Sequence, residues 1–575
     1  MDCQTYVCCG HIALDHFSGV ITRSYEPSQK MASEVQGHCR PRRCPDKDGG
    51  AQIPAGGGAM VSGEILGSII QAPPCPAHPS GNRELGPGER DSKGKGPTRA
   101  LSRYSGSLAL LGVLGIGLLR VEGAHAEVYF QGSWRTRVEA WRWFEVPGYQ
   151  SRYTYGHSLF RLGLHWHHGP HEAILEVAGV ALLHVPTRAV APSPAGQLGP
   201  GGTLQAVNGG RDASVFPKQF FYRWRSGSLA LQVGRWEFGD GTEGGLDHPR
   251  LVWIRQSRIA HRILGPFSFS PVQRSFDGLF GQYHRPWGTV TALVAWPTRG
   301  VFDLRAYTPL TRVVVGYGSL VRGWKPASGA AEGRLFSLTY FDDRDVLKPD
   351  NRPLAERTAD SAGVHIVTVG THGIVVRDGR PLRWDGMLWA AAQWGRWGRL
   401  RHAAYAVALE GGIQVDGPGD PWIRVGAFMG SGDADPRDGT HGTFIPGPNT
   451  PRPYALIPFY NLSNLMDGFV QVLWTPHRRV RLRADLHRLV LHRAADLWYG
   501  GGGPYDDRTW GVVGRPSAGR RGLATVVDGS LTVTLGRGWR LEVYHGTAWA
   551  GPVLRAVYPQ GERLHFTFLE AHWGW

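Results

Sequence analysis

Strict alternation of polar and apolar residues is the feature that most constrains the fold of this chain. The segment 479–487 reads Arg-Val-Arg-Leu-Arg-Ala-Asp-Leu-His, with a charged or polar residue at every odd position. Successive side chains of a β-strand point to opposite faces, so this segment would have one polar and one apolar face. The apolar face meets a protein core in a soluble sheet. In a membrane barrel it meets lipid, and the charged face lines the lumen.

The same period of two recurs along the chain after residue 126. The segments are short and are separated by Gly, Pro, Asp and Asn, as antiparallel β-structure requires. No apolar run long enough for a transmembrane helix occurs there, and strands do not alternate with helices. We therefore predict an all-β fold with strands in the segments 134–140, 160–167, 229–235, 289–296, 312–320, 334–341, 365–371, 388–394, 402–410, 422–429, 467–474, 479–487, 530–535, 540–544 and 564–575.

Two features favour a transmembrane antiparallel β-barrel over a secreted sandwich. Tryptophans recur near the expected strand ends, as in the aromatic girdles of membrane barrels, at positions 141, 143, 166, 224, 236, 296, 389, 394, 397, 422 and 474. In the last segment, Leu569, Ala571, Trp573 and Trp575 alternate with Glu570, His572 and Gly574. An amphipathic final strand that ends in an aromatic residue resembles the assembly signal of outer-membrane proteins.

Residues 103–126 have the three parts of a secretory leader. Arg103, together with the preceding Arg99, provides a positive flank, Leu108 to Leu119 is apolar, and Ala124-His125-Ala126 has the small-x-small pattern of a cleavage site. The apolar run is shorter than the roughly 20 residues that a membrane-spanning helix needs. A buried helix is the alternative. We predict a signal peptide over residues 103–126, cut after Ala126, followed by the barrel over residues 127–575.

Residues 1–102 form a different kind of sequence. They are rich in Gly, Pro, Ser and charged residues without a helical or strand period. All six cysteines lie before residue 76, and Cys39 and Cys44 lack the second pair that a zinc site would need. We expect this segment to be disordered, or to precede the true start of translation.

The charge of the chain predicts an anionic partner. The net charge is +16, and only seven of the 63 basic residues are lysine. Residues 127–575 keep 50 basic and 36 acidic residues, a net charge of +14. Arginine stays charged at any accessible pH and binds carboxylate or phosphate through two parallel hydrogen bonds. We expect no nucleic-acid partner, because the chain has no zinc-finger spacing, helix-turn-helix pattern or RNA-binding aromatic motif.

Several motifs resemble, in their order, those of the alginate export family of outer-membrane barrels. They are Leu229-Ala-Leu-Gln-Val-Gly-Arg-Trp-Glu-Phe-Gly-Asp-Gly241, Arg250-Leu-Val-Trp-Ile-Arg255, Arg274-Ser-Phe-Asp-Gly278, Gly430-Ser-Gly-Asp-Ala-Asp-Pro-Arg-Asp-Gly439 with Thr443-Phe444, and Asn461-Leu-Ser-Asn-Leu465. The resemblance covers residues 132–575. The terminal Trp575 departs from the usual pattern, in which Phe is commoner.

The resemblance implies an 18-stranded monomeric barrel in the outer membrane of a Gram-negative bacterium. Its arginine-lined pore would pass an acidic, alginate-like polysaccharide outward and would work with periplasmic export machinery. Membrane lipid and lipopolysaccharide would surround it, and both termini would face the periplasm. Strands of about 9 to 11 residues fit comfortably in residues 127–575. A general or anion-selective diffusion porin for small solutes is the alternative.

The arginine-lined pore gives a set of candidate residues. On this hypothesis the pore is lined by Arg135, Arg137, Arg161, Arg235, Arg274, Arg479, Arg481 and Arg483, and moderated by Glu139, Asp277 and Asp485. The alternative is that these arginines and acids pair across the lumen into a rigid network. The surplus of positive charge favours anion passage, because pairing alone needs no surplus.

Other constellations predict no catalytic or metal site. Asp433, Asp435 and Asp438 lack the spacing of a calcium loop, and His165 and His167 are typical of a lumen-facing strand. No nucleophile elbow, zinc-protease helix or Walker loop is found in the sequence. We expect a chain without enzymatic activity, cofactor or metal.

Overall fold

The computed structural model describes residues 121–123, 126–451 and 454–575. The expected extension over residues 1–102, its cysteines and most of the expected leader lie outside the described residues. The short strand β1 (Val121–Gly123) pairs with β2. No helix within the described residues is long and apolar enough to cross a membrane.

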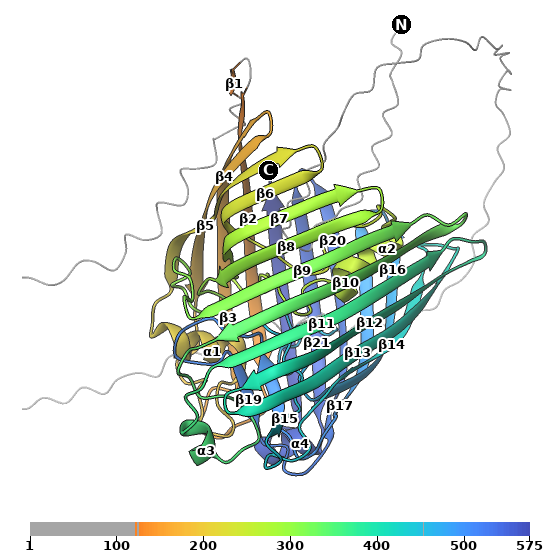
Figure 1. Cartoon of the computed structure of the whole chain (residues 1–575). Coiled ribbons are helices and arrows are strands. Elements are labelled where there is room, and N and C mark those ends of the chain that lie inside the picture. Colours follow the sequence, from red (N-terminus) through yellow and green to blue (C-terminus); the bar gives the residue numbers. More distant parts are fainter. Residues whose placement is uncertain (1–120, 124–125, 452–453) are drawn as a thin grey trace, which may run out of the picture. The chain divides into compact units, whose positions relative to one another are not determined.

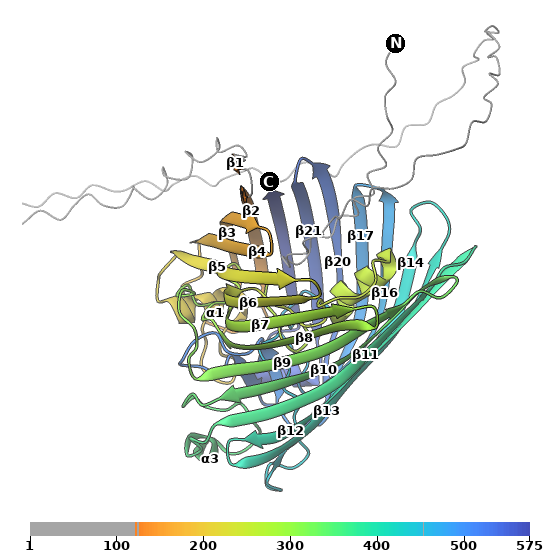
Figure 2. The ribbon, with the colours of Figure 1, turned by 45° about the horizontal axis from the view of Figure 1, so that its top comes forward.

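The described chain forms a closed barrel of 18 antiparallel strands (Figures 1 and 2). Each strand pairs with its neighbour in chain order, and the last strand pairs with the first, which closes the ring. The strands are β2 (Ala126–Arg142), β3 (Arg152–His168), β4 (His171–Leu183), β5 (Ala213–Ser226), β6 (Leu229–Trp236), β7 (Phe276–Arg285), β8 (Gly288–Pro297), β9 (Val313–Trp324), β10 (Gly329–Asp342), β11 (Val364–Arg377), β12 (Leu382–Trp397), β13 (Leu400–Val415), β14 (Trp422–Gly430), β16 (Leu465–His477), β17 (Val480–Leu491), β20 (Gly522–Gly536), β21 (Trp539–Ala550) and β22 (Arg563–Gly574).

Alternation places apolar residues on the outer face. In β17, Leu486 is 49% exposed on the outside, whereas Asp485 and His487 are buried on the inside. In β4 and β13, Leu175 and Leu409 are likewise exposed. An outer apolar surface of this kind is stable only in contact with lipid, so the barrel is a membrane protein.

Exposed tryptophans lie near both ends of the barrel wall. Trp287, Trp324, Trp384, Trp474 and Trp539 are near the end that carries the short turns, and Trp296, Trp394 and Trp549 are near the other. The expected girdle is therefore present, but its membership differs from the prediction. Trp141, Trp143, Trp236, Trp389, Trp397 and Trp422 are buried inside the barrel, because the loops that fold inward pack against them.

The two ends of the barrel differ in their connections. Short turns such as 169–170, 227–228 and 478–479 join strands at the end where the C-terminus lies (Figure 1). The opposite end carries long loops. These contain α1 (Gly199–Asn208), α3 (Leu354–Thr358), β15 (Thr440–His441), α4 (Pro552–Val557) and the hairpin of β18 (Trp498–Gly501) with β19 (Val512–Arg515).

Closure extends to the last residue of the chain. Backbone hydrogen bonds join Gly132 and Trp575 in both directions, with N–O distances of 3.2 and 3.1 Å. The expected final strand over residues 564–575 thus forms the seam of the barrel with β2.

Three strands lack the alternation and were not predicted. In β4, Ile174 and Val180 are apolar on the inner face because inward-folded loops cover them, so both faces are apolar. In β5, Pro217 lies at a register shift, as expected of proline in a sheet. In β7, Gly278 and Gly281 interrupt the pattern.

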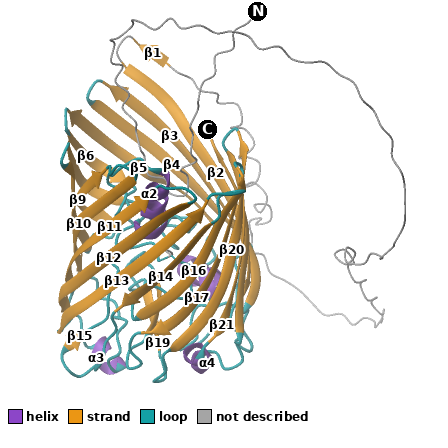
Figure 3. Cartoon of the chain, turned by 90° about the vertical axis from the view of Figure 1, so that its right-hand side faces the viewer, coloured by secondary structure: helices purple, strands orange, loops and turns teal. Residues whose placement is uncertain are grey.

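One long connection folds into the lumen. Residues 237–275, which we call the inward loop, join β6 to β7 and carry α2 (Pro249–Ile254) and a π-helical turn (Arg255–Ile259). Figures 2 and 3 show α2 within the ring of strands. The loop contacts β10 and β13 on one side and β2 and β3 on the other, so it divides the lumen.

Candidate functional site

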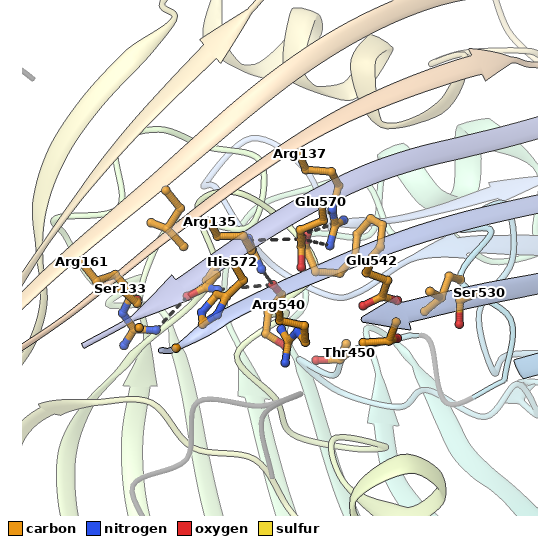
Figure 4. A pocket seen from close by; sticks show the side chains of 18 of the residues that line it. Ser133, Arg135, Arg137, Arg161, Thr450, Ser530, Arg540, Glu542, Glu570 and His572 are labelled. Carbon is orange, nitrogen blue, oxygen red and sulfur yellow. Dashed lines mark hydrogen bonds and ion pairs between the residues drawn. The ribbon is translucent and has the colours of Figure 1, made fainter. Parts of the chain in front are cut away.

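A cavity of about 580 Å³ lies between the inward loop and one part of the barrel wall. Its lining comes from β2, β3, β4, β5, β16, β17, β20, β21 and β22, together with the inward loop (Figure 4). Seven arginines line it: Arg135, Arg137, Arg161, Arg258, Arg481, Arg483 and Arg540. Three acidic residues do so: Glu176, Glu542 and Glu570. The cavity is therefore rich in positive charge.

Arg137 and Arg135 share one acidic partner at the barrel seam. Arg137 Nη2 lies 2.6 Å from Glu570 Oε2, and Arg135 Nε lies 3.8 Å from the same oxygen. Arg135 also donates to the carbonyls of Ser268 and Ser270, at 2.5 and 2.7 Å. These bonds tie the tip of the inward loop to β2 and leave two arginines facing one carboxylate (Figure 4).

Arg161 joins the loop to the next part of the wall. Its Nη2 lies 2.6 Å from Glu176 Oε1 on β4 and 2.7 Å from Glu237 Oε2 at the start of the inward loop. A third carboxylate contact is made by Lys218, whose Nζ lies 3.1 Å from Glu237 Oε1. The two cations and two acids form a nearly balanced cluster, so Arg161 adds little net charge to the cavity.

Arg481 differs from these arginines. Its side chain is exposed to the cavity, and no hydrogen bond or ion pair joins it to any residue in the described part of the chain. Two positions along β17, Arg483 donates to Asp485 and to the carbonyl of Tyr454. Arg481 is therefore free to bind an anion that enters the cavity, whereas Arg483 is held in place.

The opposite side of the inward loop is anchored by buried ion pairs. Glu410 on β13 accepts from Arg258 Nε at 2.8 Å, and it also lies 3.6 Å from Arg262 Nη2 and 3.2 Å from Arg424 Nη2. Arg334 on β10 lies 3.1 Å from Asp240 Oδ2. All of these side chains are buried. Pairing in the lumen, the alternative considered from the sequence, describes this side well.

A further ion pair and a neutral histidine complete this anchor. Arg255 Nη1 lies 2.6 Å from Glu332 Oε2 on β10. Burial lowers the pKa of His261 to about 3, so its imidazole stays neutral and adds no charge. The loop is thereby fixed across the lumen with its charges paired, while the surplus positive charge lies on the cavity side.

Five of the predicted residues line the cavity, and two others support them. The five are Arg135, Arg137, Arg161, Arg481 and Arg483. Glu139 and Asp485 are buried in the wall next to them. Glu139 Oε1 lies 3.5 Å from Arg137 Nη1 and accepts from Tyr155 and Trp141 through its other oxygen, and Asp485 pairs with Arg483.

The other four predicted residues neither line this cavity nor pair with the arginines that do. Arg235 and Asp277 pair with each other across β6 and β7. Each lies two positions from a residue that is exposed on the outer face, Val233 in β6 and Leu279 in β7, so both belong to the outward-facing positions of their strands. Arg274 is fully buried and donates to the carbonyls of Gly265, Gly502 and Pro504, so it fastens loops together. Arg479 lies in the turn between β16 and β17 and is exposed. These four residues lie outside the lining of this cavity, and a role for them in a pore stays a prediction.

Several lining residues were missed. Arg540 and Glu542 lie on β21, and Glu570 and His572 lie on β22, all on the inward parity of predicted strands. The alternation alone could have identified them. Arg258 comes from the inward loop, and no periodic signal in the sequence marks a loop that folds into a lumen.

Comparison with known proteins gives a family and a set of similar folds. The sequence model of the family described as Alginate export matches residues 226–566. OccAB4 of Acinetobacter baumannii is 8% identical with a TM-score of 0.48, covering 80% of this chain and 99% of that chain. A BenF-like porin of Pseudomonas fluorescens Pf-5 is 8% identical with a TM-score of 0.49, covering 78% and 99%. OccK2 (OpdF) of Pseudomonas aeruginosa in complex with glucuronate is 9% identical with a TM-score of 0.49, covering 78% and 97%. No curated protein matches.

Proposed function

Because this chain belongs to the alginate export family and forms an outer-membrane β-barrel channel, we propose that it exports an anionic, uronate-type polysaccharide through its arginine-lined cavity. A uronate polymer carries a carboxylate on each sugar. Guanidinium groups bind carboxylates through paired hydrogen bonds. The match between the repeated carboxylates and the seven arginines of the lining supports this substrate class.

One observation carries the proposal. Arg481 faces the cavity with no partner in the described residues, although it lies beside an ion-paired arginine on the same strand. A structural network has no need of an unpaired cation. A group that receives and releases passing carboxylates must be unpaired when the pore is empty.

The acids of the lining suit transport rather than tight binding. A conduit needs binding that is favourable enough for entry and weak enough for exit. Glu570 shares Arg135 and Arg137, so a passing carboxylate competes with a resident one for both arginines. This competition lowers the affinity of Arg135 and Arg137 for the carboxylates of the polymer. Arg481 then attracts a carboxylate that has left them.

A diffusion porin for small anions is the second candidate. The observation that favours it is the inward loop, which divides the lumen and is fixed by buried ion pairs on β10 and β13. The cavity that remains, about 580 Å³, has the size of a small-ligand site, for which about 300–1,000 Å³ is usual. Such a cavity holds a short saccharide at any one time.

Block of conductance by oligouronates of increasing length separates the two functions. The barrel is inserted into planar bilayers, and mono-, tri- and hexauronates are added at equal carboxylate concentration. An exporter should be blocked more strongly as the oligomer lengthens, because several sugars contact the arginines together. Equal block by all lengths would favour the porin. Block that is absent at every length would reject both.

A further inference from the structure

Three buried residues on neighbouring strands form a cluster outside the cavity lining. Asp485 of β17 and Asp528 of β20 are cross-strand partners, and His487 lies two positions further along β17. Their exposed fractions are 3%, 4% and 0%. One potential ligand atom from each lies within 4.8 Å of the others. We call these three residues the β17–β20 cluster.

The imidazole of His487 is oriented by a carboxylate. Its Nδ1 lies 3.1 and 3.2 Å from the two oxygens of Asp467 on β16. A carboxylate accepts hydrogen bonds, so Nδ1 carries the proton and Nε2 of the neutral ring has a free lone pair. Nε2 is buried and has no partner among the described residues. A carboxylate behind a histidine is the usual outer-shell arrangement of a metal-binding imidazole.

Two oxygens near His487 are also unsatisfied. Asp528 Oδ2 accepts from Tyr544, whereas Oδ1 is buried and has no partner in the described chain. Gln471 donates its amide nitrogen to Asp485 and leaves its own oxygen without a partner there. Buried acceptors without a donor are costly, and a cation bound among them would lower this cost.

The summed charge around the β17–β20 cluster also favours a bound cation. With all three carboxyls ionised, Asp467, Asp485 and Asp528 contribute three negative charges, and Arg483 contributes one positive charge. With a neutral His487, a divalent cation would bring the sum to zero. Buried charge is tolerated when it is paired or bound to a metal, so neutrality is a strong requirement here.

We propose that Asp485, His487 and Asp528 bind a divalent transition-metal ion of the Zn²⁺ class, with Asp467 as the outer-shell partner of His487. A mixed nitrogen and oxygen donor set suits this class better than Ca²⁺ or Mg²⁺, which prefer oxygen alone. The ion would join β17 to β20. It would also fix Asp485, the carboxylate that holds Arg483 at the cavity.

Metal binding to the intact, tag-free barrel tests this site. The protein is purified in detergent, stripped with chelator, and titrated with Zn²⁺, with bound metal counted by elemental analysis and folding checked by heat-modifiable gel mobility. We expect one equivalent and a rise in the unfolding temperature. Asp467→Asn should weaken binding by about 10- to 100-fold, as loss of an outer-shell partner does. His487→Gln and Asp528→Asn should abolish it.

The matched control is His365→Gln, at a half-buried histidine whose Nε2 lies 3.0 Å from Asp343 Oδ1. It should bind Zn²⁺ as the wild type does. Failure of the folded wild type to bind Zn²⁺ at micromolar concentration would overturn the proposal, as would equal binding by folded Asp528→Asn. If His487→Gln does not fold, Asp467→Asn and Asp528→Asn still decide the question, because both keep the shape of the side chain.

Discussion

Arg137 and Glu570 face each other across the seam that closes the barrel. They are cross-strand partners on β2 and β22, and Arg137 Nη2 lies 2.6 Å from Glu570 Oε2 although 433 residues separate them in the chain. Arg137 also lies over the rings of Phe269 and Phe568, at 4.0 and 4.4 Å. One ion pair thus connects the first strand, the last strand and the inward loop.

Loss of this carboxylate should destabilise the closed barrel. Glu570→Gln leaves the buried Arg137 with only the more distant Glu139, and we expect the free energy of unfolding to fall by about 1–3 kcal/mol. Urea titration in lipid vesicles, followed by heat-modifiable gel mobility, measures the change. The control Glu562→Gln alters an exposed loop residue and should leave the midpoint unchanged. Equal midpoints for all three proteins would refute a role of the pair in closure.

The inward loop should loosen when its anchor is removed. Glu410 is close to Arg258, Arg262 and Arg424, so Glu410→Gln removes a carboxylate that three buried arginines share. Arg424 keeps its ion pair with Asp385. We expect larger and noisier single-channel conductance, because the loop would no longer hold one position in the lumen. Glu356→Gln, on the exposed helix α3, is the matched control. Conductance that stays at the wild-type value in Glu410→Gln would show that the loop is held by other contacts.

At the end of the barrel that carries the long loops, docking of the loop that contains Asp433 should depend on pH. Burial and the nearby charge of Asp496 raise the pKa of Asp433 to about 7. An undocked loop would release this proton near pH 4. The docked state binds more protons between these values, so docking should weaken as the pH rises from about 4 to 7 and stay constant above.

Hydrogen exchange of residues 431–451, corrected for intrinsic rates, measures this dependence. Protection should be greater at pH 5 than at pH 8, and Asp433→Asn should remove most of the difference. Asp212→Asn, at an exposed residue of another loop, should keep it. Protection that rises with pH would contradict the assigned proton.

Removal of the last residue should slow assembly. Trp575 makes two backbone hydrogen bonds with Gly132, and its ring packs with Trp573 at a centroid distance of 4.4 Å. Deletion of Trp575 shortens the seam between β2 and β22. We expect slower folding into vesicles, measured by the appearance of the heat-modifiable form. Trp575→Phe should fold at nearly the wild-type rate, and an equal rate for the deletion would exclude this role.

Most strands of the barrel could be predicted from the alternation of polar and apolar residues. It located the strands wherever one face is polar, and it failed at β4, where the inner face is covered by loops and is apolar as well. The same alternation also bears on the site. In β6, Arg235 shares its parity with Leu231 and Val233, which are exposed on the outer face. Parity thus indicated that Arg235 would point away from the lumen.

The rest of the site depends on tertiary structure. The inward loop has no period that distinguishes a segment inside a lumen from one outside, so Arg258 and its partner Glu410 could not be paired from the sequence. The buried Arg274 likewise depends on three carbonyls that only the folded loops bring together. The resemblance to a family predicted the number of strands and an anion channel as the function to consider. The structure showed which side of the barrel carries unpaired positive charge.

Anion selectivity of the Arg481→Glu variant is the most direct test of the arginine-lined cavity. Reversal potentials are measured in planar bilayers under a salt gradient for the wild type, Arg481→Glu and the control Arg479→Glu, which changes an exposed arginine in the neighbouring turn. The wild type should be anion-selective, Arg481→Glu should lose most of this selectivity together with block by oligouronates, and Arg479→Glu should change little. A cation-selective wild type, or an Arg481→Glu variant with unaltered selectivity, would contradict the account.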